Sequence, residues 1–427
     1  MQKTPKIAVI GLGYVGLPLL SAFSKHFSVI GYDVDDRHIG DLRNGIDRRN
    51  MLSPSAEEAL LSTHVTSEVS ELRGANVFVI TVPTPVGPEN KPDLEPLLNA
   101  CDAVAAVIEA GALVIIESTV YPGVTENICG PRIESRCGLS TMKDFKLAYS
   151  PERINPGDSS RGLDNVVKVI SAQDDDALER VSAIYSKVVK AGVFKASSIG
   201  VAEAAKVFEN VQRDVNIAAV NELARICDAL AISTKEVLSA AATKWNFLGF
   251  SPGLVGGHCI GVDPYYLAAK SISAGYVPKL ILSTRELNES MVEFVSDKIV
   301  NLLNLKKIAK FCRIGVLGMT FKENVNDLRN SKTIEVINNL TAHDIEVVVC
   351  DPVVDASLAG NLIQAPLVNL EELRDLDALL VMVPHDEFRQ IGIVELLRKV
   401  RNDGIFVDIK GIFDSGLLPE GMTYWSL

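Results

Sequence analysis

Four short apolar segments occur twice in this chain of 427 residues, once in each half and in the same order. Stretches with the apolar spacing of helices lie between them. Short, wholly apolar strands that alternate with helices indicate parallel sheets buried on both faces. We therefore predict an α/β fold with two Rossmann-like, doubly wound parallel-sheet domains. The paired segments are residues 6–16 and 313–323, 29–35 and 347–353, 76–85 and 377–386, and 111–119 and 404–411.

A long helix is predicted between the two halves. Residues 201–232 contain no glycine or proline, and apolar side chains such as Val201, Ala205 and Phe208 recur at helical spacing. At 1.5 Å per residue, about 30 residues span on the order of 45 Å, which is longer than a small domain. We expect this helix to join the halves and to offer a face to a second subunit in a homodimer or larger homo-oligomer. The predicted domains are residues 1–199, 200–300 and 301–427.

The composition is that of a globular protein, with 47% apolar and 22% charged residues. A net charge of −12 without a basic run argues against nucleic acid or an anionic membrane as partner. The seven scattered cysteines include no CxxC pair, which favours reduced thiols in the cytoplasm over disulfides or a metal site. Lys3 and Lys6 before the apolar residues 7–23 mimic a signal peptide, but the same pattern recurs deep inside the chain.

The first paired segment carries a dinucleotide-binding pattern. Its GxGxxG sequence follows a strand and opens a helix, so that the glycines allow a tight turn and close approach of a pyrophosphate. Asp33 ends the next strand about 20 residues on, where a carboxylate accepts from a ribose hydroxyl and repels a 2′-phosphate. We therefore predict NAD as the cofactor. A glycine turn without a ligand would explain the glycines but not the acid. The predicted contacts are Gly11, Gly13, Tyr14, Val15, Gly16, Asp33 and Arg37.

Two threonines follow later strands of the first half. Thr84 and Thr119 stand at strand ends, where ligands of open parallel sheets bind, and we predict that both contact NAD, although a hydrogen bond to the backbone explains each equally well. The second half lacks the glycine fingerprint and has the cations Lys322 and Arg329 after Gly318. We infer a different, phosphate-bearing ligand there, with a solvated basic face as the alternative.

One cysteine lies in a glycine-rich loop. Residues 251–266 read SPGLVGGHCIGVDPYY, with Gly253 and Gly256 among four glycines around Cys259. Because glycine has no side chain, we expect a large ligand to lie against this backbone. A thiol is the most nucleophilic side chain near neutral pH, so Cys259 is a candidate for covalent catalysis. A buried structural cysteine is the alternative.

Six motifs of this chain resemble those of the UDP-glucose/GDP-mannose dehydrogenase family, in the same order and over essentially the whole length. They are GLGYVGLP, STVYPG, SPERINPG, AEAAKVFEN, GGHCIGVDPYY and GMTFKENVNDLRNS. The resemblance implies that a sugar C6 alcohol is oxidised to a carboxylate with two NAD. It also implies that Cys259 adds to the intermediate aldehyde, so that a second hydride can leave and a thioester forms.

The resemblance assigns roles residue by residue. Lys206 would serve the oxyanion or proton transfers, Asn210 would hold the substrate, and Asp263 would orient water or the lysine, although capping of the next helix also explains Asp263. Glu152 would assist thioester hydrolysis, with Thr119 positioning the water. The residues expected to contact the nucleotide-sugar are Glu152, Arg153, Lys206, Asn210, Gly253, Gly256 and Lys322, whereas Arg329 would contact NAD.

The form of the cysteine motif bears on the substrate. GHCIGVDPYYL is similar to the branch that acts on UDP-N-acetylhexosamines, the UDP-N-acetylglucosamine 6-dehydrogenases of capsule, Vi and O-antigen synthesis. Enzymes acting on UDP-glucose usually have lysine where this chain has Val262. We expect UDP-GlcNAc before UDP-GalNAc. The alternatives are a UDP-glucose or UDP-ManNAc enzyme, a single-hydride 3-hydroxyacid-type dehydrogenase, and a non-catalytic sensor.

Overall fold

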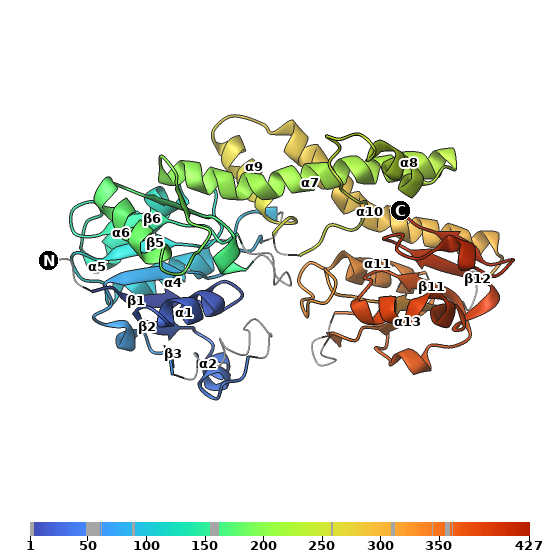
Figure 1. Ribbon diagram of the computed structural model, residues 1–427, viewed down its shortest axis with the longest axis horizontal. Coiled ribbons are helices and arrows are strands. Elements are labelled where there is room, and N and C mark those ends of the chain that lie inside the picture. The colour runs from blue at the N-terminus through green and yellow to red at the C-terminus, as the bar shows by residue number, and fades with distance from the viewer. Residues whose placement is uncertain are drawn as a thin grey trace. The chain divides into compact units, whose positions relative to one another are not determined.

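The computed structural model describes residues 4–47, 60, 62–87, 90–153, 162–257, 259–308, 312–343, 345–354, 359–360 and 362–427 (Figure 1). The chain forms two compact units. The N-terminal unit comprises Met1–Glu209 with Tyr265–Val277, and the C-terminal unit comprises Asn210–Pro264 with Pro278–Leu427. Within the described ranges, no helix is long and apolar enough to cross a bilayer.

The N-terminal unit is built on an eight-stranded sheet with the order β3-β2-β1-β4-β5-β6-β7-β8. Neighbouring strands are parallel except β6 and β7, so the predicted parallel sheet has one reversal. A parallel connection needs a long crossover, and the described part of the segment between these strands forms only the short 3₁₀ helix Leu163–Asn165. The strands are β1 (Lys6–Ile10), β2 (Ser28–Tyr32), β3 (His64–Thr66), β4 (Val77–Ile80), β5 (Leu113–Ile116), β6 (Lys146–Tyr149), β7 (Lys168–Ala172) and β8 (Val193–Lys195).

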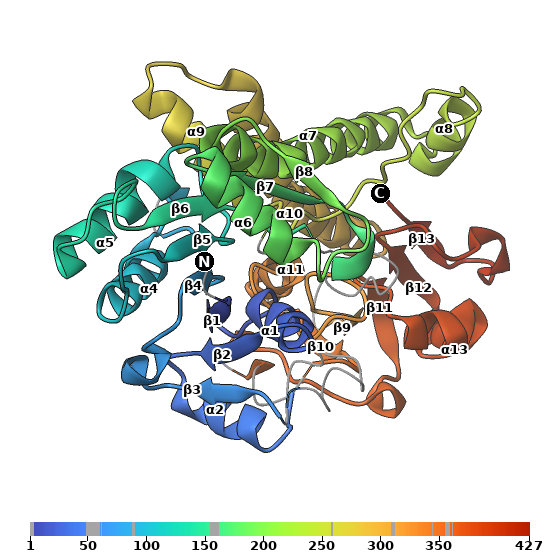
Figure 2. The same ribbon diagram turned by 60° about the vertical axis from the view of Figure 1, so that its left-hand side comes forward.

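Helices cover both faces of this sheet (Figure 2). Ile7 and Val9 of β1 pack with α1 (Gly16–Ser24), α2 (Asp36–Arg43) and α6 (Asp175–Tyr185). Ala8 and Ile10, which point the other way, pack with α4 (Glu95–Ala105) and α5 (Gly130–Cys137). Burial on both faces explains why the strand has no polar residue after Lys6.

The C-terminal unit contains a five-stranded parallel sheet with the order β10-β9-β11-β12-β13. Its strands are β9 (Arg313–Leu317), β10 (Glu346–Cys350), β11 (Leu376–Val381), β12 (Val400–Asp408) and β13 (Thr423–Trp425). The helices α10 (Lys279–Leu305) and α11 (Lys332–Thr341) pack on one face, and α13 (Asp386–Leu397) packs on the other. Both predicted Rossmann-like sheets are therefore confirmed.

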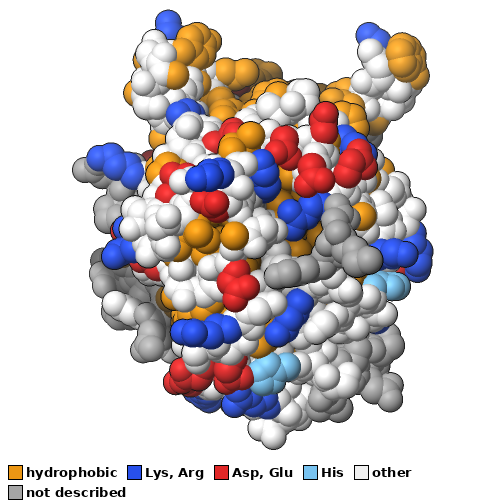
Figure 3. All heavy atoms as spheres, turned by 90° about the vertical axis from the view of Figure 1, so that its left-hand side faces the viewer, with side chains coloured by type: hydrophobic (Ala, Val, Ile, Leu, Met, Phe, Trp, Pro, Cys, Tyr) orange, Lys and Arg blue, Asp and Glu red, His pale blue; other side chains and the backbone are white. Residues whose placement is uncertain are grey.

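The predicted long helix is α7, which runs without a break from Ile199 to Leu230. It is followed by α8 (Thr234–Ala241) and, after the cysteine loop, by α9 (Asp263–Ser273). Several apolar side chains of α7 are exposed, namely Val201, Phe208, Ile226 and Leu230. On the face of the molecule drawn in Figure 3, basic and acidic side chains are interspersed and neither forms an extended patch.

The two sheets repeat one turn geometry. Gly11 after β1 has φ +90° and donates to the carbonyl of Tyr32, and Gly318 after β9 has φ +81° and donates to the carbonyl of Cys350. In the N-terminal unit the carboxylate of Asp33 accepts from the amide of Leu12 at 2.8 Å. In the C-terminal unit the carboxylate of Asp351 accepts from the amide of Met319 at 2.6 Å. The sequence repeat is thus also a repeat of backbone structure.

Candidate active site

The glycine turn of the N-terminal unit leaves room only for glycine at two positions. A Cβ on Gly16 would lie 1.8 Å from the carbonyl oxygen of Gly11, and one on Gly11 would lie 2.9 Å from the side chain of Val82. Between them Gly13, Tyr14 and Val15 are partly exposed and lead into the N-terminus of α1. Backbone amides at a helix N-terminus favour an anionic group, so this turn fits the pyrophosphate of a dinucleotide.

Asp33 lies beside this turn. One carboxylate oxygen accepts from the amide of Leu12 and the other accepts from the amide of Asp35 at 3.1 Å. The side chain remains partly exposed, and Arg37, in the first turn of α2, is exposed. The carboxylate therefore holds the glycine turn and is still accessible to a ribose hydroxyl, which is the arrangement that a dinucleotide needs.

The two strand-end threonines are joined by a hydrogen bond. The hydroxyl of Thr84 donates to the backbone carbonyl of Thr119 at 2.7 Å, and Thr84 is buried. For Thr84 this is the backbone bond that the sequence offered as an alternative to a ligand contact. Thr119 is partly exposed after β5, at the edge of the sheet where ligands bind in open parallel sheets.

Glu152 and Arg153 follow β6 at the same edge, immediately before residues 154–161, which lie outside the described ranges. Arg153 forms an ion pair with Glu209 of α7 at 2.6 Å and donates to the carbonyl of Val167 at 2.9 Å. Some of the N–H donors of its guanidinium are therefore already bonded to acceptors within the protein. The carboxylate of Glu152 lies 3.4 Å from the buried amine of Lys168.

Three buried polar residues lie on successive turns of α7. Glu203 accepts from the amides of Gly123 and Thr125, at 2.6 and 2.9 Å, and so fixes the segment after Thr119 to the helix. Lys206 is 8% exposed and lies one turn on. Asn210, 5% exposed, follows after another turn and donates to the carboxylate of Asp263 at 2.5 Å. Lysine is almost never buried so deeply unless it is paired, and asparagine is mostly exposed.

The cysteine loop ends in a turn at the start of α9. The carbonyl of Cys259 accepts from the amide of Asp263 at 2.9 Å and from that of Val262 at 3.2 Å. Cys259 is exposed, whereas Cys137 is partly buried and the other five cysteines are buried. A buried structural role for Cys259 is therefore wrong. Asp263 is the first residue of α9, not the residue before the helix as the sequence predicted. His258, next to Cys259 in the chain, lies outside the described ranges.

The glycines of this loop make room for protein as well as for a ligand. A Cβ on Gly256 would lie 2.6 Å from the carbonyl oxygen of Asn330, and a Cβ on Gly257 would lie 2.6 Å from the ring of Phe321. A Cβ on Gly253 would meet the amine of Lys410 at 2.7 Å. The glycines therefore also allow close packing within the protein, because the loop packs closely on the turns that follow β9 and β12.

A cavity of about 200 Å³ opens in the C-terminal unit between this loop and the strand ends. Three lysines line it: Lys322 and Lys332 beside the turn after β9, and Lys410 after β12. Gly253, Gly256 and Lys322, which the sequence assigns to nucleotide-sugar binding, lie in its wall. Several cations and hydroxyl groups converging on one cavity suit a diphosphate. The hydroxyl-bearing residues of the lining are Ser251, Thr320, Ser331 and Thr333.

Arg329 does not line this cavity. Its guanidinium forms a two-pronged ion pair with Asp327, with bonds of 2.6 to 3.1 Å, and its side chain is half exposed.

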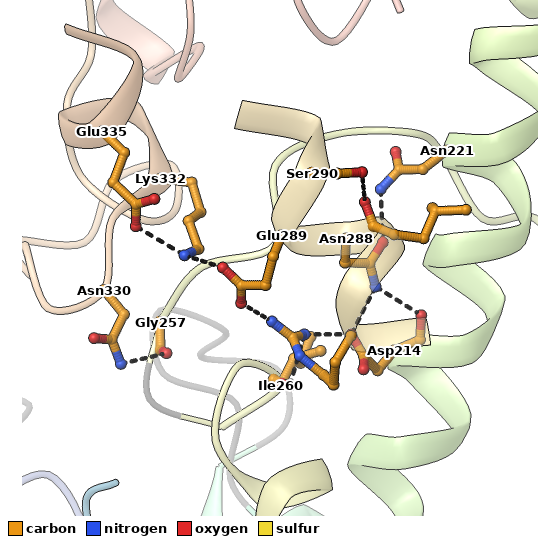
Figure 4. Close-up of polar contacts among 12 residues, drawn as sticks. Asp214, Asn221, Gly257, Ile260, Asn288, Glu289, Ser290, Asn330, Lys332 and Glu335 are labelled. Atoms are coloured by element: carbon orange, nitrogen blue, oxygen red, sulfur yellow. Dashed lines mark hydrogen bonds and ion pairs between the residues drawn. The ribbon is translucent and has the colours of Figure 1, made fainter. Parts of the chain in front are cut away.

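A polar network that includes the carbonyl of Ile260 in the cysteine loop was not predicted from the sequence (Figure 4). Arg285 of α10 is 2% exposed and donates to Asp214 of α7 at 2.7 Å and to the carbonyl of Ile260 at 3.5 Å. It also pairs with Glu289, which in turn pairs with Lys332 of the cavity wall. The network thus joins the residue after Cys259 to the lysine-lined cavity.

The signals for these residues were weak but present. Glu203 belongs to the AEAAKVFEN motif, and Lys332 follows directly after GMTFKENVNDLRNS. Lys410 lies in the last of the paired segments. Arg285 and Glu289 stand four apart on a helix, but such a pair is usually a solvated surface pair.

Comparison with known proteins identifies the family. Among curated proteins, Protein CapL of Staphylococcus aureus is 46% identical over 424 residues, which is 99% of each chain. The UDP-N-acetyl-D-glucosamine 6-dehydrogenase of Pseudomonas aeruginosa is 43% identical over 97% of this chain and 98% of its own. Among solved structures, the UDP-D-ManNAc dehydrogenase of Pyrococcus horikoshii aligns with a TM-score of 0.89 at 31% identity, over 99% of this chain and 98% of that one.

Three family models match in succession. The NAD binding domain matches residues 5–189, the central domain matches residues 200–290, and the UDP binding domain matches residues 315–415. The first contains the glycine turn with Asp33, the second contains Cys259, and the third contains most of the lysine-lined cavity wall. With these matches, and with relatives more than 40% identical over nearly the full length, the chain belongs to the UDP-glucose/GDP-mannose dehydrogenase family.

Proposed function

We propose that this protein oxidises the C6 hydroxyl of a UDP-N-acetylhexosamine, UDP-GlcNAc before UDP-GalNAc, to the uronic acid with two NAD. The observation that carries this proposal is the exposed Cys259 in a loop whose glycines wall a cavity with three lysines. A four-electron oxidation needs a nucleophile to hold the aldehyde, and a single-hydride dehydrogenase has no use for one. We further propose that the product serves surface polysaccharide synthesis in the cytoplasm, because the cysteine motif GHCIGVDPYYL resembles that of enzymes of capsule, Vi and O-antigen synthesis.

The substrate assignment rests on relatives and on the cysteine motif. The UDP-N-acetyl-D-glucosamine 6-dehydrogenases of Pseudomonas aeruginosa and Salmonella typhi are each 43% identical to this chain. The UDP-N-acetyl-D-mannosamine dehydrogenase of Methanocaldococcus jannaschii is 34% identical. Both groups support an N-acetylhexosamine, and the higher identity favours the glucosamine form.

The residues of the N-terminal unit fit NAD. Gly13, Tyr14 and Val15 would face the pyrophosphate with their amides, and Asp33 would accept from the ribose hydroxyls. Each of two NAD molecules, bound in turn, would accept one of the two hydrides that leave C6.

Cys259 would act between the two oxidations. Its thiolate adds to the C6 aldehyde and gives a thiohemiacetal, which becomes a thioester when the second hydride leaves. Water then attacks the carbonyl carbon, the C–S bond breaks, and the carboxylate product leaves as the thiolate of Cys259 is regenerated. Overall, one alcohol, one water and two NAD⁺ give one carboxylate, two NADH and three protons.

The other predicted site residues take the remaining roles. Lys206 would stabilise the oxyanion, and Asn210, held by Asp263, would orient the sugar. Glu152 would take the proton of the water that hydrolyses the thioester, with Thr119 positioning that water. Arg153 and Lys322 would contact the nucleotide-sugar, and Arg329 would contact NAD. We retain the division into residues 1–199, 200–300 and 301–427 as NAD-binding, central and UDP-sugar-binding domains.

A substrate panel tests this function. We expect two NADH per UDP-GlcNAc and a kcat/KM for UDP-GlcNAc that exceeds that for UDP-glucose by about 100-fold or more, because buried polar groups that face an N-acetyl group are left unpaired without it. UDP-GalNAc and UDP-ManNAc complete the panel and identify the epimer. Equal turnover of UDP-glucose would refute the N-acetylhexosamine assignment, and one NADH per sugar would refute the four-electron reaction.

A further inference from the structure

A buried cluster of charged residues lies next to Glu152. Lys168 and Glu117 are 2% and 1% exposed and form an ion pair of 2.7 Å. The fully buried hydroxyl of Tyr185 donates to the other oxygen of Glu117. The amine of Lys168 also lies 3.4 Å from the carboxylate of Glu152. These residues come from four different segments of the N-terminal unit, so their meeting is a property of the fold.

The strand reversal brings Lys168 to the ligand-binding edge of the sheet. β7 pairs with β6 in the antiparallel sense, with Tyr149 opposite Ser171. Lys168, three residues before Ser171, therefore lies beyond the carboxyl end of β6, where Glu152 follows. Glu117 directly follows β5 at the same edge. With β7 parallel to β6, Lys168 would lie at the opposite edge.

The two carboxylates that flank Lys168 differ in their exposure to solvent. The side chain of Glu117 is 0% exposed, whereas that of Glu152 is 11% exposed. Burial acts to lower the pKa of Lys168, but the two carboxylates outweigh it and the pKa is raised, so the amine stays protonated. Burying a lysine and a glutamate costs several kcal/mol, and an apolar pair of the same size is often as stable. Stability alone therefore does not account for this cluster.

We propose that Lys168 is a positioning residue for Glu152: its amine, anchored by Glu117, fixes the carboxylate that receives a proton during thioester hydrolysis. Glu152 is also held by its own chain, because one of its oxygens accepts from the amide of Arg153 at 2.6 Å. The other oxygen faces Lys168. This inference rests on the proposed role of Glu152 in hydrolysis. Loss of Lys168 should then slow the attack of water on the thioester and leave both oxidation steps intact.

Rapid-quench kinetics of Lys168→Met test the proposal. A catalytic group misplaced by about 1 Å costs on the order of 100-fold in rate, so we expect a burst of two NADH per active site followed by a steady rate about 100-fold below that of the wild type. Intact-mass spectrometry during the slow phase should find the acyl adduct on Cys259. The control is Lys195→Met, which removes an exposed lysine of the neighbouring strand β8 that pairs with Glu179 of α6. This variant should behave as wild type.

A double variant separates positioning from a general structural role. If Lys168 acts through Glu152, adding Lys168→Met to Glu152→Gln should cost no further activity, because the target is already lost. Lys168→Arg, which keeps the charge, should recover most of the steady rate. If Lys168→Met folds poorly, Glu117→Gln weakens the same anchor without changing its size. This variant should also show a burst of two NADH, followed by a smaller reduction of the steady rate.

Three results would overturn the positioning role: a wild-type steady rate in Lys168→Met, loss of the burst together with the steady rate, or an additive loss in the double variant. Failure of the proposed function is distinguishable from these. In that case the wild-type enzyme itself would form no adduct on Cys259 and release no second NADH. The Lys168 variants would show the same result.

Discussion

Asp33 performs two tasks with one carboxylate. It accepts from the amide of Leu12 and thereby holds the glycine turn, and it remains partly exposed for a ribose. A carboxylate in this place repels a 2′-phosphate, which is the physical basis for preferring NAD over NADP. Arg37, exposed in the first turn of the next helix, is the nearby cation that would instead attract a 2′-phosphate and so favour NADP.

Asp33→Ser should narrow the cofactor preference. Serine keeps a hydrogen-bonding oxygen but removes the negative charge, so the ratio of kcat/KM for NAD to that for NADP should fall by about tenfold or more, equivalent to about 1.4 kcal/mol. Part of the change will be weaker NAD binding, because the turn loses an acceptor. Asp36→Ser, three residues on in the first turn of α2, is the matched control. An unchanged ratio in Asp33→Ser would remove the ribose–carboxylate contact from the account.

At the scale of the elements, the second sheet has the same glycine turn as the first, but the acid beside this turn is buried. Asp351 occupies the position of Asp33 but is 7% exposed, and both its oxygens accept from backbone amides. The amide of Asn324 donates to Nδ1 of His385, which leaves the proton on Nε2, 3.1 Å from Asp351. Burial acts to raise the pKa of Asp351, but His385 and the amides outweigh it and the pKa lies below its ordinary value. The acid is structural here.

Asp351→Asn should destabilise the C-terminal unit by about 2–3 kcal/mol, because charge-assisted bonds to amides are lost and an NH₂ group meets backbone donors. Since the folded pKa is lowered, the ionised carboxylate stabilises the fold above its unfolded value near 3.8, and this contribution is lost as the pH falls through the folded value. The difference in the free energy of unfolding between wild type and Asp351→Asn should therefore be largest at pH 7 and decrease below about pH 4.

Urea unfolding followed by tryptophan fluorescence measures this difference, because both tryptophans, Trp245 and Trp425, belong to the C-terminal unit. Asp33→Asn changes the equivalent acid of the other unit and should leave this transition in place. An Asp351→Asn midpoint equal to that of wild type at pH 7 would show that the buried acid contributes nothing.

The elements were predictable where the pattern is local. The paired strands, the glycine turn and α7 follow from apolar runs and spacing that each segment carries by itself. The reversal of β7 and the cluster of Lys168, Glu117 and Tyr185 do not, because a lysine at a strand start resembles a solvated residue until the partner strands are placed. Arg285 was missed for the same reason, since its partners are distant in sequence.

At the scale of the whole molecule, the exposed apolar residues of α7 support the proposed homodimer. Ile226 and Leu230 are 50% and 63% exposed and stand one helical turn apart. Just beyond α8, Trp245 is 92% exposed. Large apolar side chains grouped on one segment mark an interaction site more often than a solvated surface. A second copy of this chain is the partner that we propose.

Light scattering at micromolar concentration should find at least a dimer for the wild type. Ile226→Asp combined with Leu230→Asp should weaken association by about 100-fold or more, since each apolar side chain contributes roughly 1.5–3 kcal/mol when buried. The control is Gln212→Asp, which adds an acid at an exposed polar position nearer the N-terminus of α7 and should leave the assembly unchanged. A wild-type monomer with full activity would mean that α7 only connects the two halves of the chain.

The central claim is that Cys259 carries the sugar as a thioester, and mass spectrometry of enzyme quenched during turnover with UDP-GlcNAc and NAD tests it most directly. We predict a UDP-sugar acyl adduct on the peptide that contains Cys259. Cys259→Ser should lack the adduct, bind NAD normally, and lose at least about 100-fold of the steady two-NADH rate, because a serine hydroxyl is far less ionised near neutral pH. Wild-type production of uronic acid by Cys259→Ser, or turnover without any adduct on Cys259, would contradict the account.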